Sequence, residues 1–164
     1  MERDLPIYLL DINLETDGMS YVALVDAPAI RQSWIALNEH KSFSVKLVSE
    51  EKRIVFGPLL IPDTPIYRKN EQLGEHFVMF TKEAIERINE KFYKEGFTSN
   101  VNLMHDPKLK VENCFMIGSF ISDETMGVVK GYEDLKLGTL FGKYKINNDE
   151  VWSKIKDGTF QGFS

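Results

Sequence analysis

The chain has a single cysteine, Cys114, and no apolar run long enough to cross a membrane. One cysteine excludes an internal disulfide framework and suits a reducing cytoplasm. A membrane-spanning helix needs about 18 to 20 consecutive apolar residues. The N-terminus reads Met-Glu-Arg-Asp and lacks the apolar core of a secretory signal. We therefore expect a soluble intracellular protein without disulfides.

Patterns typical of metal, phosphate and nucleic-acid sites are also missing. The three histidines, at 40, 76 and 105, are scattered and give no metal-ligand spacing with the one cysteine. The glycines at 138 and 142 lack the P-loop lysine and do not open a helix. The net charge of −5 argues against nucleic acid or an anionic membrane as the main partner. We expect no cofactor, no metal, no nucleic-acid partner and no membrane partner.

The 164 residues suffice for one domain, and we expect a single domain over residues 1–164. Short runs rich in β-branched and aromatic residues, separated by Gly, Pro and Asp turn signals, predict strands. These runs cover residues 7–14, 21–25, 43–48, 53–60, 75–80, 100–105, 114–122 and 138–146. The pattern indicates an α+β fold, with a mainly antiparallel β-barrel or strongly curved sheet surrounded by a few helices.

Residues 81–95 are predicted to form the one long helix. Thr81 is a suitable N-cap and Gly96 suits the position after the helix end. An apolar stripe at helical spacing runs along one face and consists of Ile85, Ile88 and Phe92. A second, shorter helix is predicted from about residue 148 to 157.

His105 and Ser164 are the candidate catalytic pair. Period-2 alternation through residues 100–105 puts Val101, Leu103 and His105 on one face of a strand, with the imidazole near its edge. Ser164 ends the chain after Gly162 and Phe163. A serine and a histidine brought together form the minimal nucleophile–base pair. A partly buried histidine satisfied by the backbone, and a merely solvated serine, are the alternative interpretations.

Other side chains offer weaker chemistry. Asp106 follows His105 but points to the opposite face of a strand, unless the chain turns at Pro107. Cys114 is the rival nucleophile, although a free cysteine is most often a small core residue. His40 and His76 are expected at the surface. The absence of Gly-x-Ser-x-Gly disfavours an α/β-hydrolase.

Several segments in chain order resemble the prohead (capsid maturation) serine proteases of tailed phages, in their prophage-like branch. Asn-Leu-Met-His-Asp at 102–106 is similar to the catalytic-histidine motif, and Gly-Phe-Ser at 162–164 is similar to the nucleophile motif. The remaining similar segments are residues 21–30, 57–68, 80–92, 118–121, 138–145 and 151–161. The likeness covers nearly the whole chain.

The resemblance implies a fold related to herpesvirus assemblins and an endopeptidase with His105 as base and Ser164 as nucleophile. It implies that scaffold and major capsid proteins are the substrates, inside the assembling prohead in the host cytoplasm. Autocatalytic self-cleavage and a homo-oligomer are further expectations. Asp123, or Glu124 beside it, is the candidate third member of the triad.

The position of Ser164 leaves a second function open. Members of the resembled family continue past the nucleophile, whereas the expected domain of this chain ends at the nucleophile motif. In the assemblin relatives the third triad member and the oxyanion-hole donors follow the serine. The alternative is therefore a catalytically incomplete protein with the protease fold, which binds scaffold or lies inside the capsid.

Overall fold

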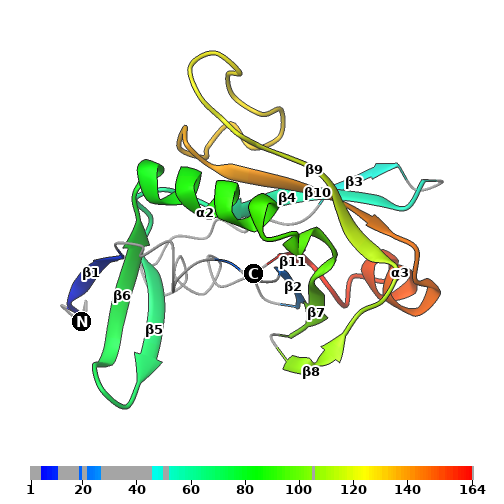
Figure 1. The fold of residues 1–164 in the computed structure, drawn as a ribbon, viewed down its shortest axis with the longest axis horizontal. Coiled ribbons are helices and arrows are strands. Elements are labelled where there is room, and N and C mark those ends of the chain that lie inside the picture. Colours follow the sequence, from blue (N-terminus) through cyan, green and yellow to red (C-terminus); the bar gives the residue numbers. More distant parts are fainter. Residues whose placement is uncertain are drawn as a thin grey trace.

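The computed structural model describes residues 5–10, 19, 22–26, 46–49, 52–104 and 106–163, with 46–49 as backbone only. This part of the chain contains eleven strands, two α-helices and one 3₁₀ helix (Figure 1). The helices are α2 (Lys82–Lys94), η1 (Phe97–Ser99) and α3 (Asp149–Lys156). The strands are β1 (Ile7–Leu10), β2 (Val22–Val25), β3 (Lys46–Ser49), β4 (Ile54–Leu60), β5 (Ile66–Asn70), β6 (Gly74–Phe80), β7 (Val101–Leu103), β8 (Asp106–Lys110), β9 (Cys114–Ile121), β10 (Leu140–Ile146) and β11 (Gly162–Phe163).

The strands form three sheets, with the orders β1-β6-β5, β3-β4-β10-β9 and β11-β2-β7-β8. Two pairings, β1 with β6 and β2 with β7, are parallel, and the other described pairings are antiparallel. The α+β class and the mainly antiparallel pairing are thus confirmed. The expected barrel is wrong for the described residues, because closure needs every edge strand to pair and each of these sheets keeps two edges.

Helix α2 begins and ends where its sequence predicts. The Thr81 hydroxyl accepts a hydrogen bond from the Ala84 amide at 3.1 Å, which satisfies one of the free donors of the first turn. Gly96 takes a left-handed conformation with φ 73° just after the C-cap, where a side chain would be strained. Helix α3 has the same kind of cap, since Asn148 accepts from the Val151 amide at 3.1 Å.

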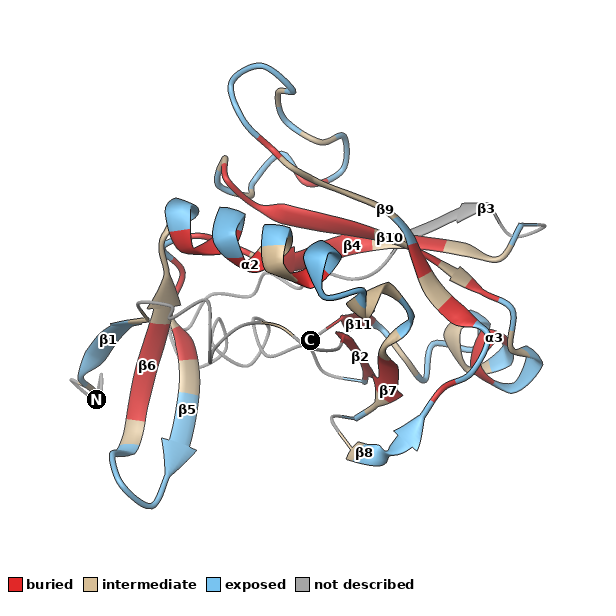
Figure 2. Ribbon diagram, in the orientation of Figure 1, coloured by how far each residue is buried: buried red, intermediate tan, exposed pale blue. Residues whose placement is uncertain are grey.

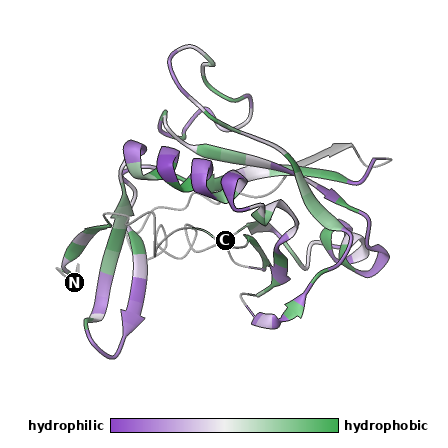
Figure 3. Cartoon of the chain, viewed as in Figure 1, coloured by the Kyte–Doolittle hydropathy of each residue, from purple (hydrophilic) through white to green (hydrophobic). Residues whose placement is uncertain are grey.

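One hydrophobic core joins α2 to two of the sheets. The buried stripe of α2 includes Ile85 and Phe92, both 0% exposed. These two side chains belong to the same cluster as side chains of β2, β4, β7, β10 and β11, among them Leu24, Tyr144 and Phe163. Figure 2 shows the buried side of α2 facing this core, and Figure 3 shows polar residues on its outer side. Within the described residues, no helix has the length and apolar character needed to span a membrane.

Three strands were not predicted: β11, which has only two residues, and β5 and β8, whose sequences lack apolar alternation. β5 is polar over Arg68-Lys69-Asn70 and gains its structure from antiparallel pairing with β6. β8 contains Pro107 and lies at the edge of its sheet, where a missing backbone donor costs no ladder bond. Residues 11–14 and 43–45 of the predicted strands lie outside the described part.

Candidate active site

The strand predicted to carry the histidine ends before it. β7 stops at Leu103, and Met104 takes a positive φ of 53°. The Met104 amide still donates to the Leu24 carbonyl of β2 at 3.0 Å, and Asp106 then starts β8 opposite Leu103. The alternation expected to extend to residue 105 is therefore wrong, because the chain turns back at Met104. His105 itself lies outside the described residues, and its role as base stays a prediction.

The nucleophile motif forms the short strand β11 on the other side of β2. Gly162 pairs with Val25 and Phe163 with Leu24. The Gln161 amide donates to the Val25 carbonyl at 2.9 Å, which extends this contact by one residue. The Phe163 ring packs in the core with its centroid 5.1 Å from that of Tyr144. Ser164 also lies outside the described residues.

Strand β2 brings the two motifs together. Leu24 has Phe163 as register partner on one side and Leu103 on the other. Adjacent strands are about 4.8 Å apart, so the backbones at Leu103 and Phe163 are about 10 Å apart. β7 runs parallel to β2 and β11 antiparallel to it, so the two motifs pass Leu24 in opposite directions. Leu103, two residues before His105, and Phe163, next to Ser164, thus flank one position of β2. Figure 1 shows β11, β2 and β7 side by side in this part of the molecule.

The carboxylates considered for the third triad position have local partners. Asp123 is exposed, and its Oδ1 accepts from the amides of Thr125 and Met126 at 2.9 and 2.7 Å. Its loop, between β9 and β10, lies on the opposite side of the molecule from β7 and β8 (Figure 1). Glu124 is exposed in the same loop. Asp106 Oδ1 accepts from the Lys108 amide at 2.9 Å. The structure does not bring Asp123 to β2, and its catalytic role stays a prediction.

Cys114 is a core residue. Its side chain is 2% exposed and belongs to the main hydrophobic cluster. Burial raises the pKa of its thiol to about 11, so the nucleophilic thiolate is scarce at neutral pH. The expectation of a small core side chain is confirmed, and the environment opposes a cysteine nucleophile.

His76 is buried, at 3% exposed, so the expected surface position is wrong. Its Nδ1 lies 3.0 Å from the Gly74 carbonyl oxygen, and the ring of Tyr8 meets its imidazole edge-on at 5.6 Å. Parallel pairing of β1 with β6 accounts for the burial, because it brings Tyr8 over this part of the hairpin. His40 lies outside the described residues.

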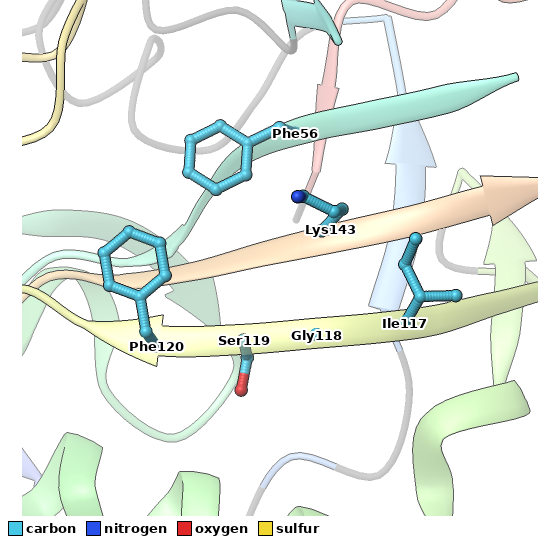
Figure 4. Close-up of a pocket in the computed structure, with 6 residues that line it drawn as sticks. All are labelled: Phe56, Ile117, Gly118, Ser119, Phe120 and Lys143. Carbon is cyan, nitrogen blue, oxygen red and sulfur yellow. The ribbon is translucent and has the colours of Figure 1, made fainter. Parts of the chain in front are cut away.

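A pocket of about 340 Å³ lies on the face of the β4-β10-β9 sheet that points away from α2. Its lining residues are Phe56, Ile117, Gly118, Ser119, Phe120 and Lys143 (Figure 4). The Ser119 hydroxyl points to the other face and donates to Asn89 Oδ1 of α2 at 3.1 Å. The lining contains no histidine and no carboxylate, so Ser119 has no base there. Nor do the described residues contain a cluster of three or more His, Cys, Asp or Glu that could hold a metal.

Asn102 is the notable residue to which sequence reasoning assigned no role. It is 5% exposed, and its Oδ1 has no hydrogen-bond partner within the described part. Leaving a buried polar atom unpaired costs about 1–3 kcal/mol. Asn102 pairs with Ala23 of β2 and Lys110 of β8, at the centre of the sheet that joins the two motifs. The signal in the sequence was a carboxamide inside an otherwise apolar strand.

Comparison with known families agrees with this arrangement. The segments on the two sides of β2 are the ones that resemble the histidine and nucleophile motifs of serine proteases. A family model with the description "Putative phage serine protease XkdF" matches residues 42–164, about three quarters of the chain. The chain belongs to this family of phage serine proteases. No curated protein and no solved structure matches it.

Proposed function

We propose that the protein is a serine endopeptidase of phage head maturation. His105 is the general base and Ser164 the nucleophile. Scaffold and major capsid proteins are the substrates, cleaved inside the prohead in the host cytoplasm, and self-cleavage and a homo-oligomer belong to the same proposal. The observation that supports it is the register at Leu24, which has a segment resembling one of the two catalytic motifs on each side. Membership of a phage serine protease family supports the reaction type.

The chemistry follows the nucleophile–base scheme. The imidazole of His105 takes the hydroxyl proton as Ser164 Oγ attacks the peptide carbonyl carbon. The tetrahedral intermediate collapses to an ester, and the imidazolium gives its proton to the leaving amine. Water then attacks the ester with the same histidine as base, which releases the acid and restores the serine.

Two other nucleophiles are disfavoured by their surroundings. The Cys114 thiol is protonated and buried in the core. The Ser119 hydroxyl is hydrogen-bonded to Asn89 and faces away from the pocket that its strand lines.

Substitution of the serine tests the proposal. Ser164→Ala should abolish cleavage of scaffold protein and labelling by a serine-reactive fluorophosphonate, with the melting temperature unchanged within about a degree, because one hydroxyl contributes little to stability. Cys114→Ser, the matched change at the rival nucleophile, should keep both activities. Retained cleavage in Ser164→Ala together with its loss in Cys114→Ser would overturn the assignment.

The second candidate is a catalytically incomplete protein that binds scaffold or lies inside the capsid. The local partners of the Asp106 and Asp123 carboxylates favour it, because one oxygen of each carboxylate already accepts a hydrogen bond from a backbone amide two residues further on. Wild-type protein that binds scaffold in a pull-down, yet neither cleaves it nor reacts with the phosphonate, would establish this candidate instead.

A further inference from the structure

We propose that the pocket on the outer face of the β4-β10-β9 sheet binds an extended, acidic peptide segment of a partner protein (Figure 4). The segment pairs with the free edge of β9, rests an apolar side chain on Phe56 and Phe120, and presents a carboxylate to the Lys143 ammonium. The pocket belongs to a different sheet from β2, so this inference goes beyond the proposed function and does not rest on it.

Stacked aromatic rings form the apolar wall of the pocket. The Phe141 ring lies 5.4 Å from the rings of both Phe56 and Phe120, centroid to centroid, with interplanar angles of 4° and 19°. The ring of Tyr132 contacts Phe141 as well, at 5.4 Å. Phe141 is therefore 1% exposed, although alternation along β10 puts it on the same face as Lys143. Rings packed in this way lose little freedom when a ligand binds, which favours an apolar side chain as the ligand.

Lys143 is the one charged side chain among the described residues that line the pocket. It lies between Phe56 and Gly118 in the register of the sheet, and Figure 4 shows its amino group on the same side as the aromatic rings. Its ammonium has no hydrogen bond or ion pair within the described part of the chain, whereas Lys145 of the same strand donates to the Lys52 carbonyl. A free cation beside apolar rings is complementary to a carboxylate next to an apolar side chain.

Gly118 leaves room for that carboxylate. A Cβ at position 118 would have no atom of the described residues within 4 Å, its chain neighbours apart, so the space above the strand is open there. The φ of Gly118 is not positive, so backbone conformation does not require a glycine. Glycine inside a strand often marks a place that a ligand or another chain approaches closely. A side chain from a strand added beside β9 can reach across Gly118 to Lys143.

The free edge of β9 indicates that the ligand is a peptide. Within the described residues β9 pairs with β10 on one side only. Edge strands are commonly protected by charged residues or proline, and β9 contains neither over its 8 residues, with Ile117 46% exposed. The unpaired backbone groups of such an edge can accept an extended segment as an additional strand.

A second copy of the chain fits this surface less well than an acidic segment. Two copies that met edge to edge at β9 would bring identical linings together, each with a lysine and neither with a carboxylate. Like charges oppose that contact, whereas a carboxylate neutralises the lysine.

Fluorescence anisotropy with a short peptide tests the proposal on the full chain. The probe is rhodamine-labelled Thr-Phe-Thr-Glu-Thr amide, which places its Phe and Glu on one face of a strand. In two control peptides Gln replaces the Glu, or Ala replaces the Phe. The Glu peptide should bind about 5-fold more tightly than the Gln peptide, the upper end for a partly exposed ion pair, and more tightly than the Ala peptide.

Three variants assign the binding to the pocket. Lys143→Met keeps the apolar stem and should bind the Glu and Gln peptides equally. Lys145→Met is the matched control, because it removes the same charge from the same strand outside the lining, and it should keep the preference for Glu. Gly118→Val fills the open space and should weaken binding of the Glu peptide at least about 10-fold. Its melting temperature should equal or exceed that of the wild type, because valine favours a strand.

The binding data can overturn the proposal in four ways: equal or absent binding of the Glu and Gln peptides by the wild type, a preference for Glu that persists in Lys143→Met, its loss in Lys145→Met, or wild-type affinity in a folded Gly118→Val. Hydrogen exchange of the amides of residues 117–121 should slow when the Glu peptide binds. Unchanged exchange would show that the peptide does not pair with β9. A wild-type dimer that becomes a monomer in Gly118→Val, measured by sedimentation velocity, would assign the surface to a second copy and overturn the proposal as well.

Discussion

Burial decides what individual side chains of this protein can do. The Cys114 thiol and the His76 imidazole are reactive types, yet both are enclosed and distant from solvent. Cys114 packs in the apolar cluster, whereas His76 has a backbone carbonyl and an aromatic ring as neighbours. Asn102 differs from both, because its buried oxygen has no partner in the described residues.

The raised pKa of Cys114 gives a prediction for thiol reactivity. At pH 8 a free thiol of pKa 9 is about 10% thiolate, whereas at a pKa of about 11 the thiolate fraction is about 100-fold smaller. Iodoacetamide should therefore alkylate Cys114 at least about 100-fold more slowly in the folded protein than in denaturant, as followed by mass spectrometry. Equal rates in the two conditions would show that the thiol is open to solvent and not held in the core.

At the scale of elements, the helices were predictable and the strand partners were not. Thr81, the apolar stripe and Gly96 specify α2 through contacts within a few residues, and the structure confirms all three. β7 could not be delimited in the same way. Its length depends on the turn at Met104 and on pairing with β2, which lies about 80 residues earlier in the chain.

The stripe of α2 gives a prediction for stability. Phe92 is 0% exposed and its ring packs edge-on against Phe97 at 6.1 Å. Phe92→Ala should lower the free energy of unfolding by about 3–5 kcal/mol, the usual cost of emptying an aromatic core site, as measured by urea denaturation. This is a large share of the roughly 5–15 kcal/mol that stabilises a domain.

The neighbouring Tyr93 is the matched control. It is 44% exposed, so Tyr93→Ala should cost much less than Phe92→Ala in the same experiment. A melting temperature of Phe92→Ala within about a degree of wild type would mean that the stripe is not part of the core.

At the scale of the whole molecule, the two predicted catalytic motifs depend on a core shared by helix and sheets. Ile85 and Phe92 of α2, Tyr144 of β10 and Phe163 of β11 lie in one cluster. A substitution in that cluster alters the packing around Leu24 of β2, which lies between the two motifs. Loss of activity after a core substitution therefore needs a stability measurement beside it before it is assigned to chemistry.

Buried acidic groups predict how stability depends on alkaline pH. Burial raises the pKa of Cys114 from 9.0 to about 11 and that of Tyr132 from 10.0 to about 12. The unfolded chain releases these protons at lower pH than the folded chain does. The free energy of unfolding therefore keeps its full value below about pH 9 and falls as the pH rises towards 12. Melting temperatures measured between pH 8 and about 12 should fall accordingly. Cys114→Ala should remove the part of this decrease that lies between about pH 9 and 11. If the melting temperatures of Cys114→Ala follow the same pH dependence as those of the wild type, burial of the thiol is not the cause of the decrease.

The sequence alone determined the features that arise from contacts within a few residues or from composition. These are helices α2 and α3 with their caps, the α+β class, the core position of Cys114 and the motifs that resemble phage proteases. Only the tertiary structure decided the sheet orders, the ends of β7, the burial of His76 and Asn102, and the placement of Leu103 and Phe163 on the two sides of Leu24. The physical reason is that helical hydrogen bonds join residues four apart, whereas strand pairing joins residues that the order of the chain does not bring together.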